Sequence, residues 1–205
     1  MRLDPQRWQA VWRELGGQAP SGSFEELQDA YADPARHYHS TAHIGACLAH
    51  FDRWQHLAED AALVELALWT HDLVYDTRRQ DNEAASAACA CRWLDVAGIG
   101  ERAAELTELI LATRHQQEPE GNDAALVVDI DLAILASDEV IYRQYEAAVR
   151  AEYSWVPEPL FRAGRTRLLR QLLALPALYQ HPPLAERWEA PARRNLQAAL
   201  AILEN

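Results

Sequence analysis

The sequence predicts an all-α protein, a helical bundle organised as a single domain. Through nearly all of the 205 residues, apolar side chains recur at spacings of three and four, which is the pattern of amphipathic helices. No strand pair or hairpin signal stands out. The length suits one large domain or two small ones, with one favoured, and a composition that is 49% hydrophobic provides for a sizeable core.

Capping signals predict where the first two helices begin. Asp4 followed by Pro5 is typical of an N-cap with proline in the first helical position, and Gly16 predicts the end of that helix. Ser23 followed by Glu26 has the spacing of a capping box. This pair therefore predicts the start of a short second helix.

The remaining helices are predicted from apolar stripes and from the residues that interrupt them. The segment 60–73 is rich in Ala and Leu and is expected to form a buried central helix. The segment 125–137 is rich in Val and Ile and fits a buried helix or a strand, of which its length and later alanines favour the helix. Breaks are expected at Pro176 and Pro182. The other predicted helices are residues 41–57, 82–98, 101–115, 138–152, 158–175 and 191–203.

Charge and composition exclude several classes of function. The formal net charge is −12 and the sequence contains no lysine, which excludes a catalytic Schiff base and a P-loop lysine. The acidic balance argues against binding to a nucleic-acid polymer or an anionic membrane. A small anionic substrate remains compatible, because a bound cation can reverse the field inside one pocket. An N-terminus with charges throughout predicts no signal peptide, and the absence of a long apolar run predicts no membrane span, so a cytoplasmic location is expected.

The strongest local feature is HDLVYDT at residues 71–77, which places His71, Asp72 and Asp76 at the end of an apolar helix. Burying an ionised carboxylate there costs several kcal/mol unless a cation or hydrogen bonds compensate. On a continuing helix Asp72 and Asp76 would share one face and repel each other. A divalent metal ion would solve both problems. The alternative is a helix end at which Asp72 simply meets solvent.

Further ligands for such an ion are available on both sides of this motif. His43 ends the upstream run RHYHSTAH, and Asp129 and Asp131 interrupt the apolar run VVDIDLAIL. On a helix these two aspartates point roughly 200° apart, so only one can face the site. Two imidazoles and two carboxylates suit one divalent ion from the set Mn, Fe, Co, Ni, Mg or Zn. The first five are favoured over a closed tetrahedral zinc.

The order His43, His71-Asp72, Asp131 resembles the H…HD…D pattern of the HD superfamily of metal-dependent phosphohydrolases. RHYHSTAH, HDLVYDT, DNEAAS and DIDLAILAS, and later VRAEY, FRAGRTRLLRQLL and ARRNL, resemble the subgroup of predicted HD phosphohydrolases. HDLVYDT is also distantly similar to the alarmone hydrolases, although Tyr75 stands where those enzymes have glutamate. The resemblance covers most of the chain.

The resemblance implies an HD-domain helical bundle in which His43, His71, Asp72 and Asp131 hold the metal between helices. It implies a single domain over residues 1–205, with a metal-site core at about 30–155 and C-terminal helices 156–205 packed on it. The implied activity is hydrolysis of a phosphoester or phosphoanhydride of a nucleotide-like small molecule. A metal-bound water would be the nucleophile.

Roles for other residues follow from their distance along the chain to the four predicted ligands. Asp76 is expected to orient or deprotonate the attacking water, with a structural role as acceptor or helix cap an equal alternative. Glu83 could serve likewise, although a solvated helix face is favoured for it. Without lysine, the positive charge that phosphate needs must come from the metal, arginine or histidine. The candidate substrate-binding residues are Arg36, His37, His39, Arg78 and His115.

Two other functional classes remain open from the sequence. A di-iron oxygenase would use His115 as an additional ligand, but one extra histidine falls short of the usual two-metal pattern. A non-catalytic ligand-binding or regulatory module has no physical need for a complete metal site. A homodimer is also left open. Core packing is favoured over an interface for four tryptophans: Trp8, Trp12, Trp155 and Trp188.

Overall fold

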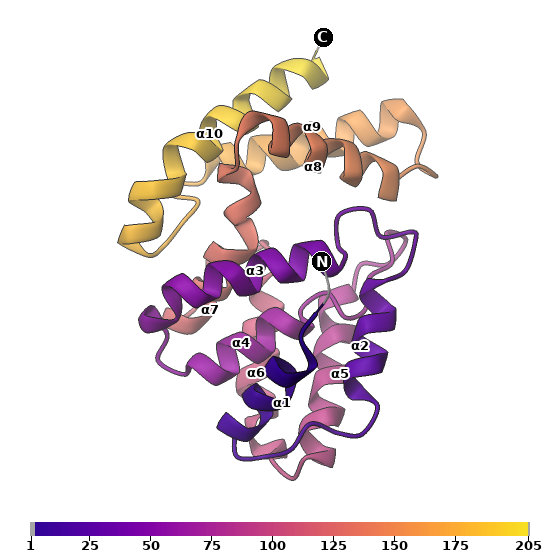
Figure 1. Cartoon of the computed structure of the whole chain (residues 1–205). Coiled ribbons are helices and arrows are strands. Elements are labelled where there is room, and N and C mark those ends of the chain that lie inside the picture. The colour runs from indigo at the N-terminus through magenta and orange to yellow at the C-terminus, as the bar shows by residue number, and fades with distance from the viewer. Residues whose placement is uncertain (1–2, 205) are drawn as a thin grey trace. The chain divides into compact units, whose positions relative to one another are not determined.

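The computed structural model describes residues 3–204 and confirms the all-α prediction (Figure 1). Within that range the chain forms ten α-helices, three short 3-10 helices and no strand. None of the described helices is both long and apolar enough to cross a membrane. The chain divides into two compact units after Asp131, whereas the sequence placed the end of the metal-site core near residue 155.

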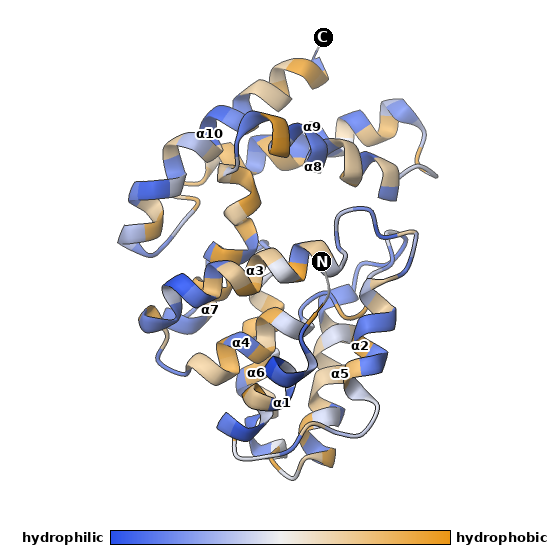
Figure 2. Ribbon diagram, in the orientation of Figure 1, coloured by the Kyte–Doolittle hydropathy of each residue, from blue (hydrophilic) through white to orange (hydrophobic). Residues whose placement is uncertain are grey.

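Unit 1, residues 1–131, is built around α4 (Figure 1). This helix contacts α1, α3, α5, α6 and α7. Apart from Glu65 its residues are mostly apolar (Figure 2), and most of them are buried, as expected for a central helix. The helices of unit 1 are α1 (Pro5–Glu14), α2 (Ser23–Tyr31), α3 (Thr41–Trp54), η1 (Gln55–Leu57), α4 (Ala61–Thr70), α5 (Asn82–Val96), η2 (Gly100–Arg102), α6 (Ala103–Ala112) and α7 (Asn122–Asp131).

The start of α1 follows the sequence prediction, but the start of α2 does not. The Asp4 carboxylate accepts a hydrogen bond of 2.8 Å from the Gln6 amide at the N-terminus of α1. The predicted capping box at Ser23 is wrong, because the N-cap of α2 is Gly22, with a φ of 81°, and Ser23 is the first helical residue. The Ser23 hydroxyl instead accepts a hydrogen bond from the Trp8 indole at 3.1 Å.

Four tryptophans from α1, α4 and α5 form an aromatic cluster in the core of unit 1. The ring of Trp8 lies edge-on to those of Trp12, Trp69 and Trp93, with centroids 5.5, 5.5 and 5.7 Å apart. Trp8, Trp12 and Trp69 are fully buried. Aromatic pairs in this geometry stabilise a core beyond their buried area. The core role predicted for the first two tryptophans is therefore confirmed.

Unit 2, residues 132–205, contains η3 (Leu132–Ala136), α8 (Glu139–Glu152), α9 (Glu158–Ala174) and α10 (Pro182–Glu204). The segment 125–137 is helical, as predicted, with α7 followed directly by η3. The break predicted at Pro182 is instead the first residue of α10, where the missing N–H of proline has no helical partner to lose. Within unit 2 Trp188 is buried, whereas Trp155 is 47% exposed, against the core role predicted for it.

Asn195 joins α10 to the η3 segment, and its removal should destabilise unit 2. Its buried Nδ2 donates hydrogen bonds of 2.8 Å to the carbonyl oxygens of Leu135 and Ser137. Asn195→Ala leaves both acceptors without this donor, and we expect it to lower the free energy of unfolding by about 2 kcal/mol. Urea unfolding followed by circular dichroism measures the loss. Gln197→Ala, at an exposed position of the same helix, is the control, and an equal effect of both substitutions contradicts the prediction.

Candidate metal centre

Three helix ends of unit 1 bring together the four residues singled out by the sequence. His43 lies in the first turn of α3, whose N-cap is Ser40. His71 is the C-cap of α4, and Asp72 follows it. Asp131 is the last residue of α7. Because α3, α4 and α7 contact one another, residues separated by almost ninety positions in the chain become neighbours.

The polar atoms of this cluster are separated by distances typical of neighbouring metal ligands. The Nε2 atoms of His43 and His71 are 3.2 Å apart. Asp131 Oδ1 lies 3.1 Å from the first and 3.4 Å from the second. Asp72 Oδ2 lies 3.2 Å from His71 Nε2 and 3.6 Å from His43 Nε2. Ligand atoms bound at about 2.1 Å from one ion are roughly 3 Å apart, so the group of His43, His71 and Asp131 could hold a metal ion.

The protein orients the His71 ring and surrounds it with negative charge. Nδ1 of His71 donates a 3.1 Å hydrogen bond to the Leu68 carbonyl, which turns Nε2 toward the carboxylates. Burial acts to lower the pKa of His71, but the carboxylates of Asp72 and Asp131 outweigh it and hold this pKa well above its ordinary value. Burial conversely acts to raise the pKa of Asp131, yet hydrogen bonds from His115, His43 and His71 keep it well below the usual range.

The raised pKa of His71 predicts the sign of a pH effect. Folding stabilisation from such a group is complete below about pH 6.5 and is lost as the pH rises through the folded pKa. We therefore expect the melting temperature of metal-free protein to fall as the pH rises above about 6.5 and through the raised pKa of His71. Saturating Mn²⁺ should reverse this trend, because imidazole binds metal only when neutral. Thermal melts with EDTA or Mn²⁺ test both signs, and a metal-free melting temperature that rises over this interval contradicts the account.

The turn after α4 does not extend the helix, which corrects the expectation for Asp76. The α-helix ends at Thr70, so Asp72 and Asp76 do not share a helical face. Asp76 is exposed, and its carboxylate accepts a hydrogen bond from the Arg78 amide at 2.9 Å. The argument that placed Asp76 beside an attacking water therefore fails. Glu83 is partly exposed and lies 3.5 Å from the Arg114 guanidinium.

The predicted substrate-binding residues occupy different positions. His37 and Arg78 are exposed. The guanidinium of Arg36 points at the protein backbone, with hydrogen bonds to the carbonyl oxygens of Asp72 and Leu73. His39 is half-buried and contributes positive charge that helps to keep the pKa of Asp72 low, after the larger effects of burial, which acts to raise it, and of His71. Of these four residues, Arg36 contacts the backbone of Asp72, and His39 affects the charge state of its carboxylate.

His115 lies beside the second oxygen of Asp131. Its Nε2 is 3.0 Å from Asp131 Oδ2, whereas Oδ1 faces the other two histidines. Its backbone φ is 53°, in the left-handed region that costs a non-glycine residue on the order of 1 kcal/mol. Within the described chain, its buried Nδ1 has no hydrogen-bond partner. The backbone at His115 is therefore strained in the conformation that places this imidazole against Asp131, a predicted metal ligand.

Two residues that the sequence did not single out form hydrogen bonds to the turn that follows α4. Ser86 Oγ accepts a hydrogen bond from the Val74 amide at 3.0 Å and donates one to the Val74 carbonyl at 3.2 Å. The Asn82 side chain likewise pairs with both the amide and the carbonyl of Asp76, each at 3.0 Å. Both residues belong to the DNEAAS block, which sequence analysis noted only for its resemblance. A polar serine within an alanine-rich helix was the available signal.

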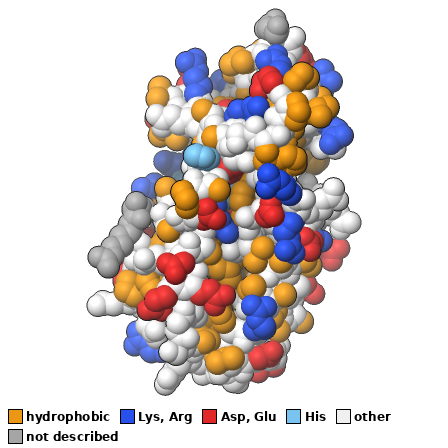
Figure 3. Space-filling view, turned by 90° about the vertical axis from the view of Figure 1, so that its right-hand side faces the viewer, with side chains coloured by type: hydrophobic (Ala, Val, Ile, Leu, Met, Phe, Trp, Pro, Cys, Tyr) orange, Lys and Arg blue, Asp and Glu red, His pale blue; other side chains and the backbone are white. Residues whose placement is uncertain are grey.

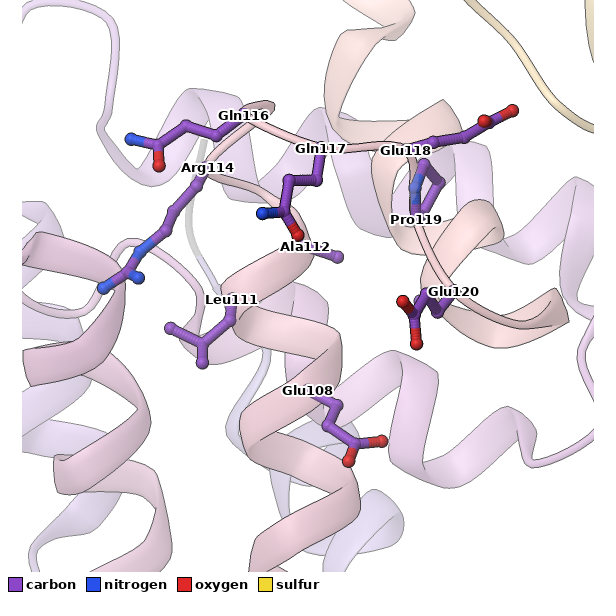
Figure 4. Close-up of a pocket in the computed structure, with 10 residues that line it drawn as sticks. Glu108, Leu111, Ala112, Arg114, Gln116, Gln117, Glu118, Pro119 and Glu120 are labelled. Atoms are coloured by element: carbon purple, nitrogen blue, oxygen red, sulfur yellow. The ribbon is translucent and has the colours of Figure 1, made fainter.

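The loop that carries His115 also borders a cavity of about 400 Å³ (Figure 4). Its lining includes the carboxylates of Glu108, Glu118 and Glu120, together with the guanidinium of Arg114. Phosphate binding requires convergent positive charge, which this lining does not supply. The cavity is therefore a poor site for a phosphoester.

No family model, curated protein or solved structure matches the chain. The resemblance to the HD superfamily accordingly stays a sequence-based interpretation. Function has to be argued from the chemistry of the cluster and of the residues around it.

Proposed function

We propose that this protein is a metal-dependent phosphohydrolase that acts on a phosphoester or phosphoanhydride of a nucleotide-like small molecule. The observation that carries the proposal is the convergence of His43, His71 and Asp131 into a group that could hold a metal ion, with an oxygen of Asp72 within 3.6 Å of both Nε2 atoms. A divalent ion held there would supply an activated water and polarise a phosphoryl oxygen.

In this proposal His43, His71, Asp72 and Asp131 bind the ion, which belongs to the set Mn, Fe, Co, Ni, Mg or Zn. The mixture of imidazole nitrogen and carboxylate oxygen is compatible with each of these metals. Asp72 lies in a turn rather than in a helix, and its contacts with both histidines support its inclusion. The carboxylates compensate the charge of the ion, and the two histidines use Nε2.

Two histidines beside the cluster support a small anionic substrate, because an imidazole N–H can donate a hydrogen bond to a phosphoryl oxygen. His39 stacks on Tyr75, with ring centroids 4.0 Å apart, and His115 contacts Asp131. These two histidines are our candidates for contacting a phosphoryl oxygen. On the face shown in Figure 3, acidic, basic and hydrophobic side chains are interspersed, without a continuous basic stripe for a nucleic-acid backbone.

The position of His115 is also compatible with a second function, that of a di-iron oxygenase. A carboxylate with one oxygen facing two histidines and the other facing a third could bridge two ions. A redox-active iron pair would then make the protein an oxygenase. The number of bound ions discriminates the proposals, since a phosphohydrolase with a single site binds one ion per chain.

Metal analysis followed by a phosphate-release screen tests the proposed function. The purified protein is analysed for bound metal, stripped with EDTA and reloaded with Mn²⁺, Co²⁺, Ni²⁺ or Mg²⁺ before a panel of nucleotides is added. The proposal predicts one ion per chain and release that depends on that ion. Two irons per chain without phosphate release favour the oxygenase, and one ion without release from any phosphorylated compound favours a non-catalytic binding module.

A further inference from the structure

The turn that carries His71 and Asp72 is held by side chains from elsewhere in the sequence. The last carbonyl groups of any α-helix lack partners within the helix. Here the Trp69 carbonyl accepts a hydrogen bond from the Tyr31 hydroxyl at 3.0 Å, close to where α4 ends. Farther along the turn, the carbonyl groups of Asp72 and Leu73 accept hydrogen bonds from Arg36 at 2.7 and 2.9 Å.

Arg36 uses the forked shape of its guanidinium in this contact. Nη1 donates to Asp72 and Nη2 to Leu73, so two consecutive carbonyl groups are fixed by one planar group. The same guanidinium lies over the rings of Tyr31 and Tyr75, at 5.2 and 5.7 Å from their centroids. Arginine is suited to such combined hydrogen bonding and stacking, whereas lysine is not.

Through Tyr75, the Arg36 guanidinium is also linked to the segment that carries His43. The Tyr75 ring lies near the Arg36 guanidinium and is also stacked with the His39 ring, at 4.0 Å between centroids and 24°. His39 in turn meets His43 edge-on, at 6.0 Å between centroids. One group therefore contacts the backbone of one predicted ligand and supports, through two rings, the segment that carries another.

We propose that Arg36 is a positioning residue that sets the geometry of Asp72 for metal binding, and that it does not bind the phosphate of the substrate. This inference rests on the proposed function, because it requires that Asp72 bind a metal. Ser86 and Asn82 complete the arrangement by fixing Val74 and Asp76, farther from Asp72 along the turn. Their contributions should therefore decrease in the order Arg36, Ser86, Asn82.

The competing assignment gives Arg36 to a phosphate oxygen. It has some support, because the buried Nε of Arg36 has no hydrogen-bond partner among residues 3–204. The two assignments predict that different affinities are weakened when Arg36 is replaced. A positioning residue affects the affinity for metal, whereas a phosphate contact affects the affinity of the metal-loaded protein for an anion and leaves metal binding intact.

The test measures two affinities for Arg36→Ala and Arg36→Lys: that for Mn²⁺ alone, and that of Mn²⁺-saturated protein for inorganic phosphate. We expect Arg36→Ala to weaken Mn²⁺ binding by about 10- to 100-fold, as is typical when the support of a metal ligand is removed. Arg36→Lys should restore only part of this loss, because an ammonium group cannot donate in a fork. Phosphate affinity at saturating Mn²⁺ should change by less than about threefold, because Arg36 already donates to the backbone.

Arg102→Ala is the matched control. Arg102 also donates to two partners in unit 1, Asp60 and Glu105, but on η2 rather than at the turn after α4. It should lower the melting temperature without weakening Mn²⁺ binding. Equal weakening by both substitutions would show a general loss of stability and overturn the inference. Should Arg36→Ala fail to fold, Arg36→Lys and Ser86→Ala carry the same comparison.

The other outcomes are also decisive. Unchanged Mn²⁺ affinity in the Arg36 variants overturns the positioning role, and a selective loss of phosphate affinity assigns the residue to the substrate instead. A wild-type protein that binds none of the tested divalent ions overturns the metal site itself, and the proposed function with it. Wild-type binding with no effect at Arg36 overturns the positioning role alone.

Discussion

Asp131→Asn is expected to weaken Mn²⁺ binding by more than about 100-fold and to reduce metal-dependent phosphate release by roughly 1000-fold. Asparagine keeps the shape of the side chain but removes the charge that faces His43 and His71. The lost affinity should exceed the 10- to 100-fold that is typical when a residue supporting a metal ligand is changed, because here a direct ligand is altered. A loss of about 4 kcal/mol of transition-state stabilisation corresponds to the expected rate effect. Calorimetric titration and single-substrate kinetics measure the two quantities.

Asp29→Asn is the matched control for this substitution. Asp29 is exposed on α2, so the same chemical change there should leave Mn²⁺ affinity and turnover within about twofold of wild type. Metal affinity retained by the Asp131 variant would show that this carboxylate is not a ligand. Full turnover by that variant would remove the reason for treating the cluster as an active site.

Trp8→Ala should produce a large loss of stability, about 3–5 kcal/mol. The side chain is fully buried, meets three other tryptophans edge-on and donates to Ser23. Its truncation leaves a cavity at the contact of α1, α4 and α5, and leaves the Ser23 hydroxyl without its donor. A loss of this size is a large part of the stability of an ordinary domain. Urea unfolding followed by far-ultraviolet circular dichroism measures it.

Two variants bracket this expectation. Trp8→Phe keeps an aromatic ring but loses the hydrogen bond to Ser23, so its effect should be intermediate. Trp155→Ala removes the same type of side chain at a position that is 47% exposed, and its cost should stay below about 1 kcal/mol. Similar losses at positions 8 and 155 would contradict the assignment of the tryptophan cluster as the core of unit 1.

The fold was predictable where the decisive interactions are local in sequence. The start of α1 depends on Asp4 and Gln6, which are two residues apart, and it was predicted correctly. The start of α2 was not, because the Ser23 hydroxyl is taken by the Trp8 indole from another helix. Pro182 was interpreted as a break between helices, although proline is also common at the first position of a helix. Local rules therefore located the helices but not all of their ends.

At the site, the cost of burying acids was the informative signal. Carboxylates within apolar runs pointed to the 71–72 pair and to Asp129 or Asp131, of which the resemblance selected Asp131, and the structure brings Asp131 and the 71–72 pair together with His43. The direction of the Arg36 side chain could not be predicted in this way. Its acceptors are backbone carbonyl groups, which every residue has, and they lie 36 and 37 positions away in the chain. The shared helical face inferred for Asp72 and Asp76 is absent because α4 ends at Thr70, which the sequence did not reveal, and the role of Asp76 stays a prediction.

The most direct test of the metal site is a crystal structure of Co²⁺-loaded protein with anomalous diffraction data collected at the cobalt edge. The account predicts one anomalous peak per chain, at about 2.0–2.2 Å from Nε2 of His43, Nε2 of His71 and a carboxylate oxygen of each of Asp72 and Asp131. A peak located elsewhere, or one that contacts only the two histidines while both carboxylates turn away, would contradict it.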